Sequence, residues 1–453
     1  MRIHFIAIGG SAMHNLAMAL HTKGYQITGS DDTIFEPSKS RLEKRGLLPQ
    51  EFGWFANKIT TDLDAVVLGM HAKADNPELL KAQELGVKIY SYPEFLYEQS
   101  KHKTRVVIGG SHGKTTITSM ILHVMNYHNK AVDYMVGAQL DGFDTMVHLT
   151  EENDFIVLEG DEYLSSPIDR RPKFHLYKPN IALLSGIAWD HINVFPTLDN
   201  YVEQFETFLK CMSNAAIMVY NEEDALVKKV VEESDKHMKR YPYQIPAHFI
   251  EDGQTYLETE EGPLPIEVFG NHNLSNLAGA KWICQHMGID EDEFYEAITT
   301  FKGASKRLEK IAESKGKVAY KDFAHSPSKV SATTSAVAKQ YNNRKTIACL
   351  ELHTYSSLNA EFLKEYAHAL DAADEAVVFY SPNAVAIKKL EEVSEQQIFN
   401  AFKRHDLKVY TTPEAFKSYL FDMNFENSVL LLMSSGNYGG LDFDEVKRLL
   451  DNK

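Results

Sequence analysis

Strand-like and helix-like segments alternate along the chain, and this alternation restricts the possible folds more than any other feature. Residues 3–8 (IHFIAI) have the pattern of a buried strand, two glycines follow, and Met13, Leu16, Ala17 and Leu20 then recur at helical spacing. Further short apolar runs stand at 65–70, 105–110, 155–160, 181–187, 215–220, 346–352, 375–380 and 429–436. Because parallel strands need long crossover connections, which are usually helical, the alternation predicts an α/β fold with parallel sheets.

The length and two breaks in this pattern predict three domains. At about 150 residues per domain, the 453 residues correspond to about three. A polar stretch, SKHKT at 100–104, gives the first break, and a glycine followed by charged residues at 303–310 gives the second. We therefore expect domains at 1–103, 104–302 and 303–453. The acidic and polar region 250–263 is expected to form a surface hairpin or loop.

Charge and cysteine content exclude several classes of partner. The formal net charge is −16 and the basic residues are scattered, which argues against nucleic acid or an anionic membrane as the main partner. Cys211, Cys284 and Cys349 lie far apart, so neither a disulfide framework nor a zinc site is expected. The sequence shows neither a secretory signal nor the roughly 18 consecutive apolar residues of a membrane span. We expect a cytoplasmic protein that is a monomer or a weak homodimer.

The strongest functional signal is a phosphate loop between a predicted strand and a predicted amphipathic helix. It consists of Gly110, Ser111, His112, Gly113, Lys114, Thr115 and Thr116. Its glycines let backbone N–H groups face a phosphate, and the helix N-terminus adds partial positive charge. Lys114 is expected to meet the β- and γ-phosphates of ATP, and the Thr115 hydroxyl to reach Mg²⁺. The common pattern has an additional first glycine where this chain has Ile108.

A second glycine turn lies at the N-terminus. Gly10, Ser11 and Met13 follow the first strand, and Asp31 comes about 20 residues later, where an acid that binds a ribose is expected. Ala7 stands in place of the first glycine of the usual pattern. These residues alone leave open a nucleotide-sugar site, an NAD site or a plain strand–helix turn.

Further motifs follow in a fixed order: LEGDE at 158–162, WDH at 189–191, GNHNLSN at 270–276, KRL at 306–308 and DFAHSP at 322–327. With the phosphate loop, they resemble the Mur ligases of peptidoglycan synthesis over almost the whole chain. The resemblance implies an N-terminal Rossmann-like domain that binds a UDP-sugar, a central P-loop ATPase domain and a C-terminal Rossmann-like domain. It also implies a ligase that phosphorylates a carboxylate with ATP and joins the acyl phosphate to an amine.

The resemblance assigns roles to individual residues. Lys114, Glu159 and His191 are expected to be catalytic, with Thr115, Glu159 and His191 as Mg²⁺ ligands. A carboxylate such as Glu159, at the end of an apolar strand, is costly unless a cation neutralises it. His272, Asn273, Arg307 and Asp322 are expected at ATP, and Gly10, Ser11, Met13, Asp31 and Asn76 at the UDP-sugar. Asp161 and Glu162 are either solvated acids or attract the incoming amine.

Two segments bear on the amine. EGDEY at 159–163, continuing through IDRRPKF at 168–174, and MSSGNYGG at 433–440 resemble the branch that adds the tripeptide L-alanyl-γ-D-glutamyl-meso-diaminopimelate. Arg170, Arg171 and Lys173 are expected to pair with the extra carboxylates of a tripeptide, the alternative being a solvated basic turn. His353, another candidate at the amine substrate, stands where both this branch and the alanine-adding branch usually carry an arginine. It replaces a permanent cation by a group that is mostly neutral at pH 7.

We therefore predict an ATP-dependent and Mg²⁺-dependent amide ligase that joins the tripeptide to the lactyl carboxylate of UDP-N-acetylmuramate. The alternative within the family is ligation of L-alanine. Two other classes are a nucleotide-binding regulatory protein without ligase activity and a small-molecule kinase. The combination of Lys114, Glu159 and His191 argues against the first, and a kinase leaves the first domain without a task.

Overall fold

The computed structural model describes residues 1–140, 142–304, 307–391 and 393–452, and it confirms the α/β class. The chain divides into two compact units. The first contains Met1–Ile187, Val202–Tyr243 and Gly279–Asp290, and the second contains Ala188–Tyr201, Gln244–Ala278 and the chain from Glu291 onward. Among the described helices, none is long and apolar enough to cross a membrane.

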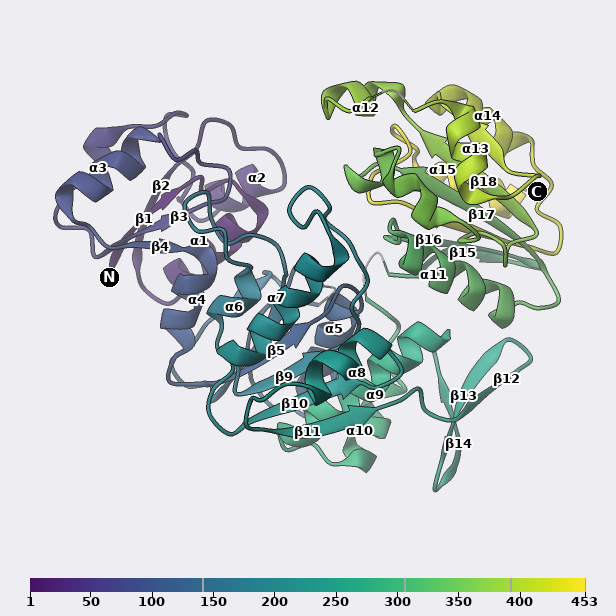
Figure 1. Ribbon diagram of the computed structural model, residues 1–453, viewed down its shortest axis with the longest axis horizontal. Helices are drawn as coiled ribbons and strands as arrows, with labels where there is room; N and C mark the ends of the chain where they lie inside the picture. The colour runs from purple at the N-terminus through teal and green to yellow at the C-terminus, as the bar shows by residue number, and fades with distance from the viewer. Residues whose placement is uncertain (141, 305–306, 392, 453) are drawn as a thin grey trace. The chain divides into compact units, whose positions relative to one another are not determined.

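The first unit begins with a four-stranded parallel sheet in the order β2-β1-β3-β4 (Figure 1). Ala7 has a φ of 68°, so β1 ends before the glycine turn and is shorter than the predicted strand at 3–8. The Asn76 side chain caps one helix, and Ser91 caps the next with a capping box. The elements are β1 (Arg2–Ile6), α1 (Ser11–Thr22), β2 (Gln26–Ser30), α2 (Ser38–Glu43), η1 (Ala56–Lys58), β3 (Ala65–Leu68), α3 (Pro77–Leu85), β4 (Ile89–Ser91) and α4 (Tyr92–Ser100).

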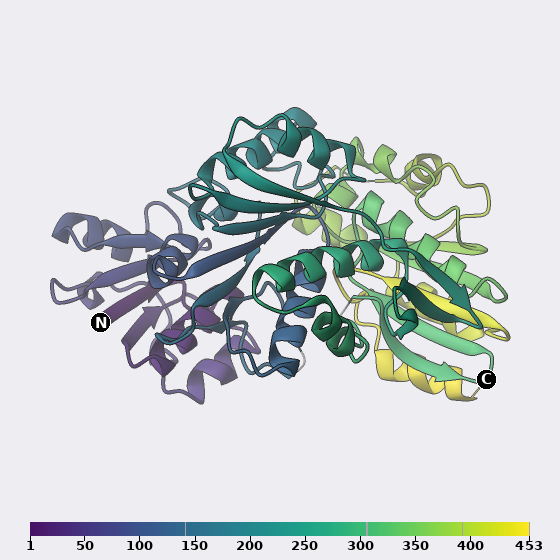
Figure 2. The same ribbon diagram turned by 90° about the horizontal axis from the view of Figure 1, so that it is seen from below.

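A seven-stranded sheet follows in the order β11-β10-β9-β5-β8-β6-β7, parallel except for β7. Because β5, β8 and β9 are parallel neighbours, their carboxyl ends lie at the same edge of this sheet, which Figure 2 shows from below. The strands of this sheet and the helices between or after them are β5 (Thr104–Gly109), α5 (Lys114–Tyr127), β6 (Asp133–Met135), β7 (Val147–His148), β8 (Phe155–Gly160), α6 (Lys173–Leu176), β9 (Ile181–Leu184), α7 (Leu198–Cys211), β10 (Ala216–Asn221), α8 (Ala225–Glu232), β11 (Met238–Tyr243) and α9 (Asn271–His286).

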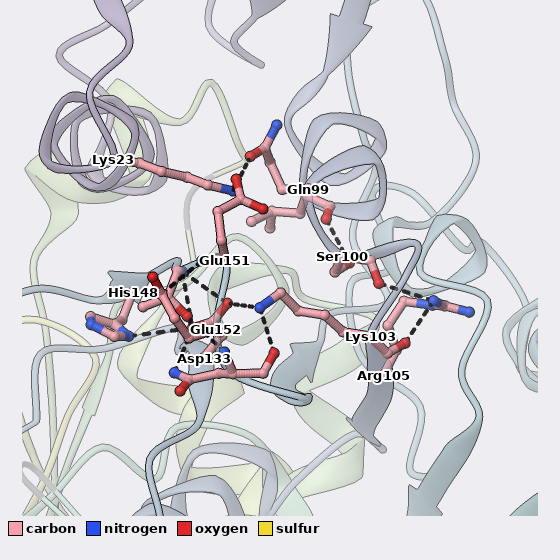
Figure 3. A network of polar contacts seen from close by, with 12 residues as sticks. Lys23, Gln99, Ser100, Lys103, Arg105, Asp133, His148, Glu151 and Glu152 are labelled. Carbon is pink, nitrogen blue, oxygen red and sulfur yellow. Dashed lines mark hydrogen bonds and ion pairs between the residues drawn. The ribbon is translucent and has the colours of Figure 1, made fainter.

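Buried polar contacts fix the passage from the first sheet to the second (Figure 3). The Arg105 guanidinium donates to the carbonyls of Ser100, Lys101 and Lys103, each at 3.1 Å. The ammonium of Lys103 lies 2.9 Å from the buried carboxylate of Asp133 on β6. The polar stretch that predicts a linker therefore forms a short turn tied to the end of α4 and to the second sheet.

The second unit contains two sheets. The three-stranded antiparallel sheet β12-β13-β14 confirms the hairpin expected at 250–263 and adds a strand to it (Figures 1 and 2). The six-stranded sheet has the order β15-β16-β20-β17-β18-β19 and is parallel except for β15. The elements are β12 (His248–Glu251), β13 (Gln254–Thr259), β14 (Gly262–Ile266), α10 (Glu291–Ile298), β15 (Glu309–Ser314), β16 (Lys317–Asp322), α11 (Pro327–Gln340), β17 (Lys345–Leu352), η2 (Ser356–Leu358), η3 (Phe362–Tyr366), β18 (Glu375–Tyr380), α12 (Pro382–Ile387), α13 (Glu395–Phe402), β19 (Lys408–Tyr410), α14 (Pro413–Asp422), β20 (Ser428–Met433) and α15 (Phe443–Asn452).

Both faces of the six-stranded sheet are buried. Alternate residues of the central strands point to opposite faces, so Leu350 and Leu431 join one apolar cluster while Cys349 and Leu430 join another. The first cluster includes residues of α11 and α13, and the second includes residues of α14 and α15. Burial on both faces explains why these strands are almost continuously apolar in sequence.

Candidate functional site

The predicted phosphate loop joins β5 to the N-terminus of α5. Gly110 and Gly113 have φ angles of 132° and 80°, which side chains other than glycine's rarely allow. A Cβ atom at Gly110 would stand 2.2 Å from the Ser185 hydroxyl. Thr115 and Thr116 are buried in the first turn of α5. The segment thus has the strand, glycine turn and helix N-terminus of a phosphate site.

The residues just after β9 form hydrogen bonds with this loop. These contacts were not predicted from the sequence. The backbone N–H of Ser111 donates to the Gly186 carbonyl at 2.9 Å, and that of Ser185 donates to the Gly109 carbonyl at 3.1 Å. A Cβ atom at Gly186 would stand 2.2 Å from the His112 ring. The predicted strand at 181–187 ends with the sequence SGI. Its glycine could have indicated that another segment approaches the backbone closely here, because glycine permits such an approach.

Lys114 lies among carboxylates. Its ammonium is 2.6 Å from a carboxylate oxygen of Glu162 and 2.6 Å from the Gly110 carbonyl. Burial alone lowers the pKa of Lys114, but the charges of Glu162, Asp161 and Glu159 outweigh burial and raise that pKa. The lysine is therefore held as a cation where a phosphate would bind. Glu162 acts here as its partner, which is neither of the two roles left open for it.

Glu159, at the end of β8, contacts the phosphate loop through its carboxylate. One carboxylate oxygen accepts the Thr115 hydroxyl at 2.7 Å, and the other accepts the Gly137 N–H at 2.7 Å. The side chain is buried, and burial, followed by the charge of Asp161, raises the pKa of Glu159. A nearby cation would relieve both effects.

These residues fit a Mg²⁺ ion of the kind that bridges nucleotide phosphates. A hydroxyl and a carboxylate oxygen converge within 2.7 Å, and Mg²⁺ commonly takes one or two protein oxygens with phosphates and waters completing its shell. Among the described residues, no group of three or more His, Cys, Asp and Glu side chains could hold a metal ion. One hydroxyl and one carboxylate oxygen are ligands that suit a metal arriving with a nucleotide, whose phosphates would complete its shell.

Among the predicted UDP-sugar residues, Gly10, Ser11 and Asp31 lie at the turn after β1. The Asp31 carboxylate accepts the Gly9 N–H at 2.7 Å and closes this turn, while Ser11 is exposed at the start of α1. Met13 is buried. Asn76 is also buried, and its side-chain oxygen accepts the N–H groups of Glu78 and Leu79 as a helix cap. The cap accounts for Asn76 without a ligand, and its role in binding stays a prediction.

The basic residues assigned to the amine substrate lie on a hairpin between β8 and α6. Arg171 donates to Asp169 at 2.6 Å, and Lys173 donates to Asp161 at 3.1 Å. Arg170 is exposed. Arg170 and Arg171 also line a surface pocket of about 460 Å³ together with residues such as His175 and Cys211. Two of the three predicted basic residues are thus already paired with acids of the protein.

His191 lies in the second unit, so its placement with Lys114 and Glu159 stays a prediction. Its φ is 54°, and its N–H donates to the Asp190 carboxylate at 2.7 Å. The other Asp190 oxygen is 3.7 Å from the Lys329 ammonium in the first turn of α11. Burial raises the pKa of Asp190, but the charges of Lys329, His191 and His325 outweigh burial and lower it. Asp190 and Lys329 are contacts of the predicted His191 segment that the sequence did not indicate.

The residues predicted to reach ATP from the second unit occupy the start of α9, the segment just before β15 and the end of β16. His272 is desolvated, which lowers its pKa, and its Nδ1 has no hydrogen-bond partner in the described structure. Asn273 donates to the Phe269 carbonyl at 3.0 Å. Asp322 accepts the Ala324 N–H at 2.6 Å, and Arg307 stacks on Phe323 at 4.6 Å. Lys306 of the KRL motif lies outside the described residues.

His353 and the glycine-rich segment at 433–440 meet after β17 and β20. The imidazole is 3.7 Å from Glu351, whose buried carboxylate accepts the Tyr438 N–H at 2.8 Å. A Cβ atom at Gly436 would stand 3.0 Å from the His353 ring. The two features that bear on the amine in this unit are therefore neighbours.

Comparison with known families accounts for most of the chain. Residues 2–104 match the Mur ligase family, catalytic domain, residues 108–284 match the Mur ligase middle domain, and residues 306–436 match the Mur ligase, glutamate ligase domain. These matches follow one another in the order expected from the sequence motifs. The exact boundaries at 103 and 302 stay predictions.

Curated relatives and solved structures agree with these matches. The chain is 29% identical to UDP-N-acetylmuramate–L-alanine ligase from Sulfurihydrogenibium sp. (strain YO3AOP1), over 100% of this chain and 98% of the relative. The fold of this chain matches that of UDP-N-acetylmuramate-alanine ligase from Thermotoga maritima, with a TM-score of 0.72, 22% identity and complete coverage of both chains. It also matches a murein peptide ligase from Psychrobacter arcticus, with a TM-score of 0.66, 20% identity and coverage of 100% and 99%. The chain belongs to the Mur ligase family, the three-domain, ADP-forming, ATP-dependent amide ligases of peptidoglycan synthesis.

Proposed function

We propose that the chain joins L-alanine to the lactyl carboxylate of UDP-N-acetylmuramate, with release of ADP and phosphate. Mur ligases bind a UDP-N-acetylmuramate-based substrate and an amino acid, and they use ATP and Mg²⁺. The observation that carries the ligase chemistry is the convergence of Lys114, Thr115 and Glu159 on one phosphate loop. The choice of L-alanine rests on full-length relatives that carry that name.

The chemistry follows from the charges that the site must neutralise. Phosphoryl transfer between two anions needs cations and backbone N–H groups at the moving phosphoryl group. Lys114 supplies a largely buried cation, and the N-terminus of α5, just after Gly113, supplies backbone N–H groups. Thr115 and Glu159, with His191 from the second unit, are proposed to hold Mg²⁺. When bound, Mg²⁺ would neutralise charge that develops on the phosphate oxygens.

The amine donor is where this proposal departs from the sequence analysis, which favoured the tripeptide. The curated relatives support the alternative, L-alanine. The ion pairs in the hairpin support it too, because Arg171 and Lys173 already face Asp169 and Asp161. A tripeptide carboxylate would have to compete with these acids.

The tripeptide remains a second candidate because of one feature. Arg170 and Arg171 line the pocket of about 460 Å³, and a guanidinium can bind a carboxylate through two parallel hydrogen bonds. L-Alanine has a single carboxylate and does not require this additional basic pocket. His353 stays a candidate at the amine substrate for either donor.

The donor is tested by phosphate release with purified protein, Mg²⁺, ATP and UDP-N-acetylmuramate. L-Alanine and the tripeptide are added separately at matched concentrations, and Arg170→Ala is measured beside the wild type. We expect a higher kcat/KM with L-alanine and no effect of Arg170→Ala on it. Preference for the tripeptide, lost in Arg170→Ala, would establish the second candidate. ATP hydrolysis indifferent to both UDP-N-acetylmuramate and the amine would refute ligation.

A further inference from the structure

We propose that Asn15 and Arg41, in the first domain, are positioning residues. They hold the carboxylate of Glu159, the proposed Mg²⁺ ligand, in place. They act through the bridging loop, defined as residues 136–140 and 142–146 between β6 and β7. The identity of the sugar nucleotide at α1 rests on the proposed function, whereas the positioning of Glu159 does not. The contacts of the bridging loop carry the argument.

At one end, the bridging loop holds Glu159. The Gly137 N–H donates to a Glu159 oxygen at 2.7 Å, and this bond leaves the other oxygen for the Thr115 hydroxyl. A Cβ atom at Gly137 would stand 2.9 Å from the Glu159 carboxylate. Glycine is therefore required for this approach, and the position of Gly137 sets the position of the carboxylate.

At the other end, Asn15 holds the bridging loop. The Asn15 side chain is fully buried in α1, and its oxygen accepts the Met146 N–H at 3.0 Å. Its nitrogen donates to the Ser11 carbonyl at 2.8 Å and contacts the Met146 sulfur at 3.4 Å. A buried N–H without an acceptor is costly, so Met146 depends on this asparagine.

Arg41 on α2 provides a second anchor. Its guanidinium donates to the Gln139 side chain at 2.6 Å and to the Asp144 carbonyl at 2.9 Å. It also lies 3.5 Å from the Asn15 oxygen. The two anchors therefore touch each other as well as the bridging loop, and the loop is held at several points from the first domain.

The same residues adjoin the predicted UDP-sugar turn. Ser11, exposed at the start of α1, lies 3.7 Å through its hydroxyl from the Met146 sulfur. A ligand that orders this turn would order Ser11, Asn15 and, through Met146, the bridging loop. Sugar-nucleotide binding should then strengthen Mg²⁺-dependent ATP binding, and the reverse effect must have the same size.

The test measures binding rather than turnover. Calorimetry gives the affinity for the ATP analogue AMP-PNP in Mg²⁺, with and without UDP-N-acetylmuramate, for the wild type, Asn15→Ala and Arg41→Met. We expect AMP-PNP to bind about fivefold more weakly in both variants, as for one lost hydrogen bond. We also expect at least fivefold tighter wild-type binding when the sugar nucleotide is present, falling below twofold in the variants.

The matched control is Lys23→Met just after α1. Lys23 pairs with the exposed Glu151 and donates to Gln99 (Figure 3), both outside the bridging loop, so this variant should not affect AMP-PNP affinity. Arg41 is partly exposed, so Arg41→Met decides the matter if Asn15→Ala does not fold. Wild-type AMP-PNP affinity in folded Arg41→Met would overturn the proposal. Absence of UDP-N-acetylmuramate binding to the wild type would instead refute the proposed function, while the AMP-PNP comparison still tests the positioning.

Discussion

At the scale of single residues, the phosphate loop combines one lysine with three acids. Lys114 pairs with Glu162 at 2.6 Å, and the charges of Asp161 and Glu159 also raise its pKa. Even with the Lys173 ammonium paired to Asp161, three carboxylates against two ammonium groups leave an excess of negative charge at the site. That excess favours a divalent cation and makes the lysine difficult to replace.

Lys114→Met should remove ligation without removing binding to the first domain. We expect kcat to fall by at least about 100-fold, as for other groups that stabilise a transition state electrostatically. The free energy of unfolding should also fall by about 3 kcal/mol, because Glu162 loses its buried partner. Phosphate release, calorimetry with UDP-N-acetylmuramate and urea unfolding measure the three effects. Lys101→Met, at an exposed pair with Glu98, is the control, and wild-type turnover in Lys114→Met would contradict the assignment.

Residue-scale prediction from sequence succeeds where the motif is local. Lys114 and Thr115 belong to a seven-residue pattern with its strand and helix on either side, and Glu159 ends an apolar strand. Gly137 and Ser185 lie far along the chain from the phosphate loop, and only the folded sheet brings them there. Isolated glycines and serines give no comparable sequence signal, so their roles could not be predicted.

At the scale of elements, β6 and β7 show that short strands are difficult to predict from sequence. They have three residues and two residues, too few for a periodic pattern, and the sequence analysis does not predict them. Longer strands such as β17 and β20 were predicted because both of their faces are buried and apolar. The short strands are instead held by contacts of Asp133 with Lys103, Thr150 and Asn153, which are distant from it in sequence (Figure 3).

Asp133 should make stability depend on pH in the acid range. Its pKa is lowered to about 2, because hydrogen bonds from His148, Thr150, Lys103 and Asn153 outweigh the raising effect of burial. A folded pKa below the ordinary value of 3.8 means that the stabilisation is complete above about pH 5. It is lost as the pH falls through 4 toward 2. The contribution is on the order of 2 kcal/mol.

The measurement is urea unfolding of wild type and Asp133→Asn at pH 7 and pH 3. We expect the variant to be less stable at pH 7 and the difference between the two proteins to shrink at pH 3. Glu375→Gln provides a comparison in the second unit, since the pKa of Glu375 is also lowered to about 2. An Asp133→Asn difference that is unchanged between the two pH values would contradict this explanation.

At the scale of the whole molecule, three domain matches and full-length relatives establish an ATP-dependent amide ligase. The ordered motifs predicted this family from sequence because each combines residue types that the chemistry requires. The amine donor was harder to predict, since the basic hairpin resembles a carboxylate site in sequence but carries its own acids in the structure. The acidic residues that pair with these basic side chains can be identified only in the folded structure.

The central claim is that the lactyl carboxylate is activated as an acyl phosphate before the amine attacks. The most direct measurement uses UDP-N-acetylmuramate labelled with ¹⁸O in that carboxylate, together with ATP, Mg²⁺ and L-alanine, followed by mass analysis of the released phosphate. Attack of the carboxylate on the γ-phosphorus, followed by displacement of phosphate by the amine, leaves one carboxylate oxygen in the phosphate. The account predicts one ¹⁸O atom per phosphate released, and unlabelled phosphate formed together with the amide product would contradict it.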